Sequence, residues 1–180
     1  MTNPAVPKPS ECLPRYVALL PAAGVGARMA AGSPKQYLPI AGKPMLRHAI
    51  DAFRSSPLIA HTYVVVSPGD AYIDALVPDE GEGVSVLRCG GATRMESIRN
   101  GLHALQDTIA AQDRVLVHDA ARPGLNAALI ERLIVETGDH AAGGLLALPV
   151  VDTAKRSGAD AVATVPRDGL GLAQSPQMFS

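Results

Sequence analysis

The architecture of the chain follows from Tyr16-Val17-Ala18-Leu19-Leu20-Pro21-Ala22-Ala23-Gly24-Val25-Gly26-Ala27-Arg28-Met29. The first five residues are apolar and short enough for a buried strand, and a turn of small residues follows. Gly24 and Gly26 can adopt positive φ and leave backbone amides unobstructed, so the turn could surround a polyphosphate with N–H donors. Arg28, and then Lys35, would add positive charge beside those phosphates. The pattern favours nucleotide binding, and a tight turn without a ligand is the alternative.

This turn matches neither of the two commonest phosphate-binding loops. A dinucleotide-binding G-x-G-x-x-G needs glycine where Met29 stands, and no G-x-x-x-x-G-K-[ST] begins at Gly24 or Gly26. A purely structural turn would require neither Arg28 nor Lys35.

Composition predicts one α/β domain. The 180 residues are 47% hydrophobic but only 3% aromatic, so the core must consist of Ala, Val, Leu and Ile, as in buried parallel sheets. The 16 Lys and Arg balance 17 Asp and Glu, which argues against recruitment of nucleic acid or an acidic membrane. Any anionic ligand must therefore be held by local charge.

Cysteine usage and the N-terminus bear on the compartment. Cys12 and Cys89 match no zinc or Cys-x-x-Cys spacing, which favours a reducing compartment without a structural metal. No run approaches the roughly 18 apolar residues of a membrane span, and residues 1–15 contain four prolines but no signal-peptide core. We expect a soluble cytoplasmic protein with a flexible tail over 1–15 and a single domain over 16–180.

A second glycine-rich loop, Cys89–Ser97, follows a predicted strand over 84–87. Thr93 and Glu96 fit a capping box, and a helix N-terminus preceded by two glycines offers amides to an anion or a base edge. A well-capped helix after a turn is the equally good alternative. The position after a strand makes this loop a candidate second wall of the pocket.

Asp119 follows another predicted strand, Arg114–His118. Ligands of open α/β sheets bind outside the carboxyl ends of strands, and Mg²⁺ prefers one or two carboxylates with phosphate oxygens and water. Asp119 is therefore a candidate Mg²⁺ ligand, with a helix cap or turn as the alternative. His118 is interpreted as structural.

Strand and helix patterns alternate along the chain, which predicts a doubly wound, mostly parallel Rossmann-like sheet with its loops on one edge. Residues 145–148 are predicted to form the last central strand. Residues 149–168 are more polar and are predicted to form an extended hairpin arm, which would pack on a second subunit.

Four motifs, in this order and spacing, resemble the 2-C-methyl-D-erythritol 4-phosphate cytidylyltransferase family of the non-mevalonate isoprenoid pathway. They are Pro21-Ala22-Ala23-Gly24-x-Gly26-x-Arg28-Met29 with Pro34-Lys35-Gln36-Tyr37, Gly90-Gly91-x-x-Arg94-x-x-Ser97, Val117-His118-Asp119-Ala120-Ala121-Arg122-Pro123, and Asp152-Thr153-x-Lys155-Arg156. The tail Ala173-Gln174-Ser175-Pro176-Gln177-x-Phe179 extends the match.

The resemblance implies transfer of a cytidylyl group from CTP to 2-C-methyl-D-erythritol 4-phosphate by a homodimer that uses Mg²⁺. It implies that Arg28 and Lys35 are catalytic and that Asp119 holds the metal. The implied CTP-binding residues are Pro21, Ala22, Ala23, Gly24, Gly26, Gly91, Ala92, Ser97 and Ala120. The implied acceptor-binding residues, some supplied by the partner subunit, are Asp119, Arg122, Thr153, Arg167 and Ser175.

The chain departs from the family pattern at three places. Ser175 stands where threonine is usual, which preserves the hydroxyl, and Gly171 stands where tryptophan is usual, which affects local packing. Relatives continue beyond the position of Ser180 and add acceptor-site residues, so we expect weak activity from this chain, as a truncation or a natural fragment.

Three alternatives stay open at this point. A cytidylyltransferase of the same fold acting on a pentitol phosphate such as ribitol 5-phosphate would have nearly identical loops. A non-catalytic dinucleotide-binding domain would leave Lys35 without a role. The chain could also be the front part of an enzyme fused to the later cyclase of the pathway.

Overall fold

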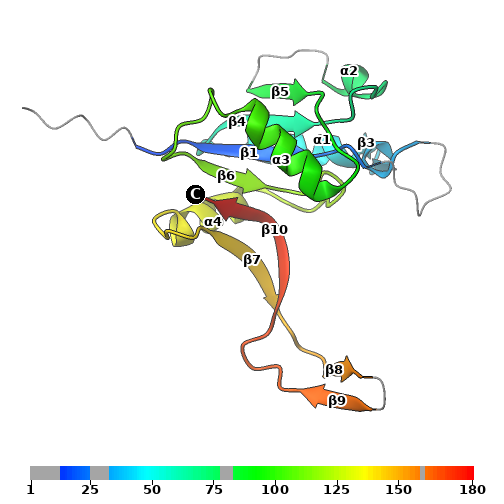
Figure 1. Ribbon diagram of the computed structural model, residues 1–180, viewed down its shortest axis with the longest axis vertical. Coiled ribbons are helices and arrows are strands. Elements are labelled where there is room, and N and C mark those ends of the chain that lie inside the picture. Colours follow the sequence, from blue (N-terminus) through cyan, green and yellow to red (C-terminus); the bar gives the residue numbers. More distant parts are fainter. Residues whose placement is uncertain (1–12, 25–32, 78–82, 159–160) are drawn as a thin grey trace, which may run out of the picture.

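A computed structural model describes residues 13–24, 33–77, 83–158 and 161–180 of the chain. At its centre lies a six-stranded sheet in the order β5-β4-β1-β6-β10-β7 (Figure 1). Its strands are β1 (Tyr16–Pro21), β4 (Ile59–Val65), β5 (Val84–Leu87), β6 (Arg114–Val117), β7 (Gly144–Pro149) and β10 (Gly171–Phe179).

The sheet is parallel on one side and antiparallel on the other. β1 pairs in parallel with both β4 and β6, and β4 pairs in parallel with β5. β10 is antiparallel to both of its neighbours, β6 and β7. The predicted α/β fold with a mostly parallel sheet is confirmed.

Helices cover both faces of the sheet. They are α1 (Met45–Arg54), α2 (Ile73–Leu76), α3 (Arg94–Ala104) and α4 (Ala127–Thr137), with a 3-10 helix η1 (Lys35–Tyr37) and a small ladder of β2 (Pro39–Ile40) and β3 (Lys43–Pro44). In Figure 1, α3 lies in front of the sheet, whereas α1 and α4 lie behind it. The fold is thus doubly wound, as predicted.

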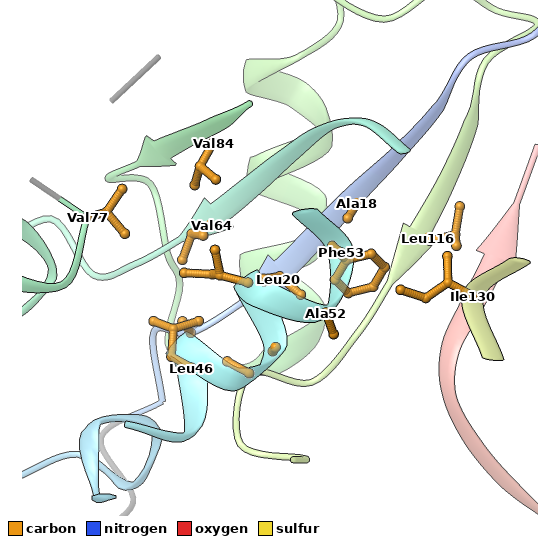
Figure 2. Packing of buried hydrophobic residues seen from close by; sticks show 14 of the residues in the cluster. Ala18, Leu20, Leu46, Ala52, Phe53, Val64, Val77, Val84, Leu116 and Ile130 are labelled. Carbon is orange, nitrogen blue, oxygen red and sulfur yellow. The ribbon is translucent and has the colours of Figure 1, made fainter. Parts of the chain in front are cut away.

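The alternation of side chains along β1 explains the two layers. Ala18 and Leu20 join the core built with α1 and α4, whereas Val17 and Leu19 join a second core on the side of α3. All four are at most 2% exposed, because a central parallel strand is buried on both faces. Figure 2 shows the first of these cores, in which Phe53 of α1 packs near Leu116 and Ile130.

Local sequence signals set the helix starts. Thr93 and Glu96 form the predicted capping box of α3, each side chain accepting a hydrogen bond from the other residue's amide. Asn126 accepts a hydrogen bond from the amide of Leu129 at the start of α4. Within the described ranges, no helix is both long and apolar enough to cross a membrane.

The prediction for residues 145–148 is wrong in one respect. They do form a strand, but β7 lies at the edge of the sheet, and the unpredicted β10 lies between it and β6. Met178 near the end of β10 is 1% exposed and belongs to the core, which explains the central place of this strand. Sequence reasoning missed β10 because Gln174, Ser175 and Pro176 interrupt any strand pattern.

The predicted hairpin arm is present. β8 (Ala154–Ser157) and β9 (Val162–Val165) pair with each other in an antiparallel two-stranded sheet. The ribbon of β7 and β10 leads to this hairpin, which projects far from the central sheet (Figure 1).

An ion pair between a buried carboxylate and a half-exposed arginine fixes the start of β6 to the segment before β1. The Asp113 carboxylate, with 2% of its side chain exposed, accepts hydrogen bonds from the Arg15 guanidinium at 2.6 Å and from the amides of Arg15 and Ala110. Burial opposes ionisation of Asp113, but these donors outweigh it, and its pKa lies below the usual 3.8.

We therefore expect Asp113→Asn to lower the free energy of unfolding by about 1–3 kcal/mol at pH 7. Because the pKa is lower in the folded chain, the contribution of the ionised carboxylate is complete above pH 3.8 and disappears as the pH falls through the folded-state pKa. The difference in free energy of unfolding between the parent and Asp113→Asn, measured by urea unfolding, should therefore become smaller as the pH falls. Asp107→Asn, at an exposed acid, is the control and should change stability by less than about 0.5 kcal/mol.

Candidate active site

Three loops at the carboxyl ends of parallel strands meet around one cavity of about 260 Å³. They follow β1, β5 and β6, and η1 closes a further side. The lining residues are Pro21, Ala22, Ala23, Gly24, Lys35, Gln36, Gly91, Ala92, Thr93, Arg94, Ser97, Asp119, Ala120 and Ala121. The predicted gathering of the loops at one sheet edge is therefore observed.

The loop after β1 is held by hydrogen bonds to its backbone. The amide of Ala22 donates to the carbonyl of Val65 at 2.7 Å, and Ser67 Oγ donates to the carbonyl of Ala23 at 3.1 Å. Gln36 Nε2 donates to the carbonyl of Ala22 at 2.5 Å. These bonds fix the start of the glycine-rich turn against the end of β4.

Two neighbours of Lys35 hold η1 in place. Gln36 is 4% exposed and donates to the loop after β1, while Tyr37 donates its hydroxyl to Asp70 Oδ2 at 2.9 Å. Burial and the bond to Asp70 raise the pKa of Tyr37, so its hydroxyl stays a donor at neutral pH. Lys35 is exposed at the cavity and has no ion-pair partner among the described residues. Its positive charge thus lies at the cavity wall.

The loop after β5 is pressed against the loop after β1. A Cβ added at Gly90 would meet the Cβ of Ala23 at 2.2 Å and the carbonyl oxygen of Val66 at 2.8 Å, so only glycine fits. Ser97, 2% exposed, accepts from the amide of Gly91 at 3.1 Å and donates to the carbonyl of Thr93 at 3.0 Å. Its hydroxyl therefore shapes this loop from within.

The loop after β6 carries a carboxylate between two guanidinium groups. Asp119 accepts from Arg94 Nε at 2.6 Å through Oδ1 and pairs with Arg122 Nε at 3.0 Å through Oδ2. Together with Lys35, the described residues place three cations and one carboxylate in this part of the molecule. Such an excess of positive charge suits a polyanionic ligand. The described residues contain no group of three or more metal-ligating His, Cys, Asp or Glu.

The structure brings many of the predicted residues together. Lys35, Asp119 and every predicted CTP-binding residue that it describes line the cavity. Gly26 and Arg28 lie outside the described residues. Arg122 reaches the cavity wall through Asp119.

The remaining acceptor candidates lie elsewhere. Thr153 and Arg167 flank the two strands of the arm, where Arg167 donates to the carbonyl of Val151. Ser175 lies on β10, where its hydroxyl is 2.9 Å from Nδ1 of His118. Burial lowers the pKa of His118, whose ring is 1% exposed.

Sequence reasoning missed the roles of Gln36 and Arg94. Both were inside the quoted motifs, but their partners, Ala22 and Asp119, lie 14 and 25 positions away. The glutamine that directly follows the candidate lysine in Pro34-Lys35-Gln36-Tyr37 was the available signal for the first. No signal in the sequence pointed to the pairing of Arg94 with Asp119.

A larger cavity of about 680 Å³ lies between α3 and the sheet, but its chemistry differs. Its walls are mainly apolar, with Ile98, Leu102, Val115 and Phe179 among them. The smaller cavity, with its glycine-rich loops and convergent charges, is the candidate active site.

Comparison with known proteins agrees with this geometry. Residues 16–180 match the family model for 2-C-methyl-D-erythritol 4-phosphate cytidylyltransferase, IspD. The chain belongs to the IspD family. The protein of that name from Dechloromonas aromatica is 48% identical over 170 residues, covering 93% of this chain and 75% of the relative. The one from Chromobacterium violaceum is 51% identical over 165 residues, covering 91% and 72%.

Solved IspD structures share the fold. A 4-diphosphocytidyl-2C-methyl-D-erythritol synthase superimposes with a TM-score of 0.81 at 41% identity, covering 94% of this chain and 76% of the other. The IspD of Francisella tularensis superimposes with a TM-score of 0.73 at 31% identity, covering 92% and 72%.

We expect Gly90→Ala to destabilise the chain by about 1–3 kcal/mol, because the added methyl group overlaps Ala23 and the backbone of Val66. Chemical denaturation measures this loss. Gly69→Ala is the matched control, since a Cβ there meets nothing within 4 Å, and its free energy of unfolding should stay within about 0.5 kcal/mol of the parent. Equal stability of both variants would contradict the close packing of the two loops.

Proposed function

We propose that this chain transfers a cytidylyl group from CTP to 2-C-methyl-D-erythritol 4-phosphate. A phosphate oxygen of the acceptor attacks the α-phosphorus of CTP, the bond from that phosphorus to the oxygen bridging it to the β-phosphorus breaks, and pyrophosphate leaves. The observation that carries the proposal is the cavity itself, in which the glycine-rich loops, Lys35 and the Arg94–Asp119–Arg122 cluster meet in a member of the IspD family.

The reaction needs positive charge more than it needs a nucleophile from the protein. Two anions must meet, and negative charge then grows on the equatorial and leaving oxygens in the transition state. Preorganised cations stabilise that charge and hold the reactants in line. We assign this role to Lys35 and Arg28, and the absence of a described ion-pair partner for Lys35 supports it.

The cytosine and ribose are assigned to the loops after β1 and β5. Ala22, Ala23, Gly91 and Ala92 line the cavity, and their small side chains allow the base to approach the backbone closely. Ser97 acts in this proposal by fixing the Gly91 loop, because its hydroxyl already bonds within that loop.

Mg²⁺ fits the site as an ion held mainly by the phosphates of the substrate. Asp119 supplies one carboxylate at the cavity, which suits an ion that takes one or two carboxylates and completes its shell with phosphate oxygens and water. Both Asp119 oxygens accept from arginines, so metal binding would take one oxygen from Arg94 or Arg122. A bound ion would neutralise phosphate charge, while Asp119 keeps the other guanidinium in place.

We further propose a homodimer in which the arm supplies part of the acceptor site. Thr153 and Arg167 lie on the arm, away from the cavity of their own chain, and Val151 and Val162 there are 71% and 64% exposed. Exposed apolar side chains on a projecting hairpin suit burial against another subunit. Arg122 and Ser175 would bind the acceptor from the same chain.

The direct test is release of pyrophosphate from CTP with Mg²⁺ and 2-C-methyl-D-erythritol 4-phosphate. We expect release that depends on this acceptor and stops when EDTA removes the cation. Lys35→Ala and Arg28→Ala should each lower kcat by about 10²–10³-fold while changing the Kd for CTP much less.

Lys43→Ala is the matched control, since Lys43 pairs with Asp51 outside the cavity and its loss should leave kcat within about twofold. Release with ribitol 5-phosphate in place of the methylerythritol acceptor would identify a pentitol phosphate enzyme. Absence of release with either acceptor would contradict the proposed activity.

The dimer is tested by sedimentation equilibrium of the chain and of Val151→Asp with Val162→Asp. We expect the parent to sediment as a dimer and the double variant to dissociate, because two charges would be buried unpaired at the interface. The same pair of substitutions at exposed apolar positions outside the arm, Leu13→Asp with Met95→Asp, should leave the dimer intact. A monomeric parent would refute the proposed assembly.

A further inference from the structure

His118 joins three parts of the proposed acceptor site. It directly follows β6 and precedes Asp119, and its ring is 1% exposed. Nε2 is 3.1 Å from the carbonyl oxygen of Arg122, and Nδ1 is 2.9 Å from Oγ of Ser175 on β10. The ring of Phe53 from α1 packs edge-on against it, with ring centroids 5.7 Å apart. Both nitrogen atoms of the imidazole therefore have hydrogen-bond partners, one in the loop after β6 and one on β10.

The chemistry of the partners gives the two hydrogen bonds a direction. A backbone carbonyl can only accept, so Nε2 of His118 must carry the proton that it donates to Arg122. In the neutral imidazole Nδ1 then has a lone pair, and the Ser175 hydroxyl donates to it. The Ser175 proton thus points at the ring, and its oxygen keeps lone pairs for another donor.

We propose that His118 is a positioning residue of the acceptor site, which holds the Asp119–Arg122 turn and Ser175 of β10 in one fixed relation. The inference rests on the proposed cytidylyl transfer. It identifies His118 as the residue that fixes the positions of Arg122 and Ser175 in the acceptor site. His118 reaches no substrate in this proposal and acts only through Arg122 and Ser175.

The strand arrangement shows why such a link is needed. The ladder between β10 and β7 shifts register between Ala173 and Gln177, so Ser175 lies where regular pairing is interrupted. β10 pairs with β6 only from Gln177 onward. The His118 bond therefore supplies a fixed point for Ser175 that the backbone ladder does not.

The same link sets the kind of group that Ser175 can meet. Because the Ser175 proton is committed to Nδ1 of His118, Ser175 Oγ can only accept a hydrogen bond from a ligand. A ligand hydroxyl can donate such a bond, whereas an ionised phosphate oxygen has no proton to donate. Ser175 would accordingly recognise the polyol part of the acceptor, and the phosphate would be left to Arg122 and other cations.

Steady-state kinetics of the full chain test the positioning role. His118→Ala should raise the KM for the acceptor about tenfold or more and leave the KM for CTP within about twofold. Ser175→Ala alone should also raise the acceptor KM, but in the His118→Ala background it should add less than about twofold, because the link is already lost. His118→Asn, with an amide near the Nδ1 position, and His118→Gln, with one near Nε2, should each recover part of the loss.

Asp113→Asn is the matched control. Asp113 is also a buried polar residue that ties two segments together, but it lies at the opposite end of β6. It should lower stability without raising the acceptor KM. An acceptor KM that stays at the parent value in all His118 variants, or that rises equally in Asp113→Asn, would overturn the inference while leaving the cytidylyl transfer intact.

A second measurement does not depend on turnover. The ¹⁵N shifts of the His118 ring should report the tautomer with the proton on Nε2, and Ser175→Ala should change the shift of Nδ1 much more than that of Nε2. A ring protonated on Nδ1 alone would refute the link even in an active enzyme. If the parent chain released no pyrophosphate, the proposed function would fall, and this measurement would still decide whether His118 orders Arg122 and Ser175.

Discussion

The parallel pairing of β1 with β4 and β6 is the constraint on which the site depends. Parallel strands point the same way, so the loops that leave them emerge at one edge of the sheet. The end of β4 then serves as a common support, since the amide of Ala22 bonds to Val65 and the amide of Gly90 bonds to Val66. Two loops separated by more than sixty positions are thereby fixed against two adjacent residues.

Local charge at the cavity, rather than the net charge of the chain, favours binding of an anion. The chain as a whole has a formal net charge of −1, which attracts no anion over distance. Asp119 nevertheless holds Arg94 and Arg122 together at the cavity, although the two guanidinium groups repel each other. The carboxylate is the means by which two cations from distant segments share one wall. This arrangement concentrates positive charge where a triphosphate would bind.

Sequence reasoning succeeded where the signal was local. β1 and β6 contain short apolar runs, and the capping box of α3 needs only residues 93–96. Three of the four family motifs lie in loops that follow strands, so their meeting at one edge followed from the topology. The hairpin arm was predicted from the polar texture of residues 149–168 and is present.

The failures share a physical cause, which is dependence on distant partners. β10 is a strand because β6 and β7 accept it, not because residues 171–179 favour that conformation, and its insertion moves β7 to the edge. Gln36 and Arg94 matter through Ala22 and Asp119, which no spacing rule connects to them. Contacts of this kind appear only when the chain has folded.

The polar character of β10 becomes understandable from the two tasks it combines. Gly171 pairs with Pro149 at the root of the arm, whereas Phe179 pairs with Val115 in the central sheet, so one strand joins the arm to the core. An apolar, β-branched sequence would suit the central position better but would remove the Ser175 hydroxyl that meets His118. The middle of β10 thus has low strand propensity, and Met178 near its end anchors the strand by packing into the core. In the proposed enzyme, the strand that anchors the arm is therefore also a wall of the acceptor site, and the position of the arm and the geometry of that site depend on the same backbone.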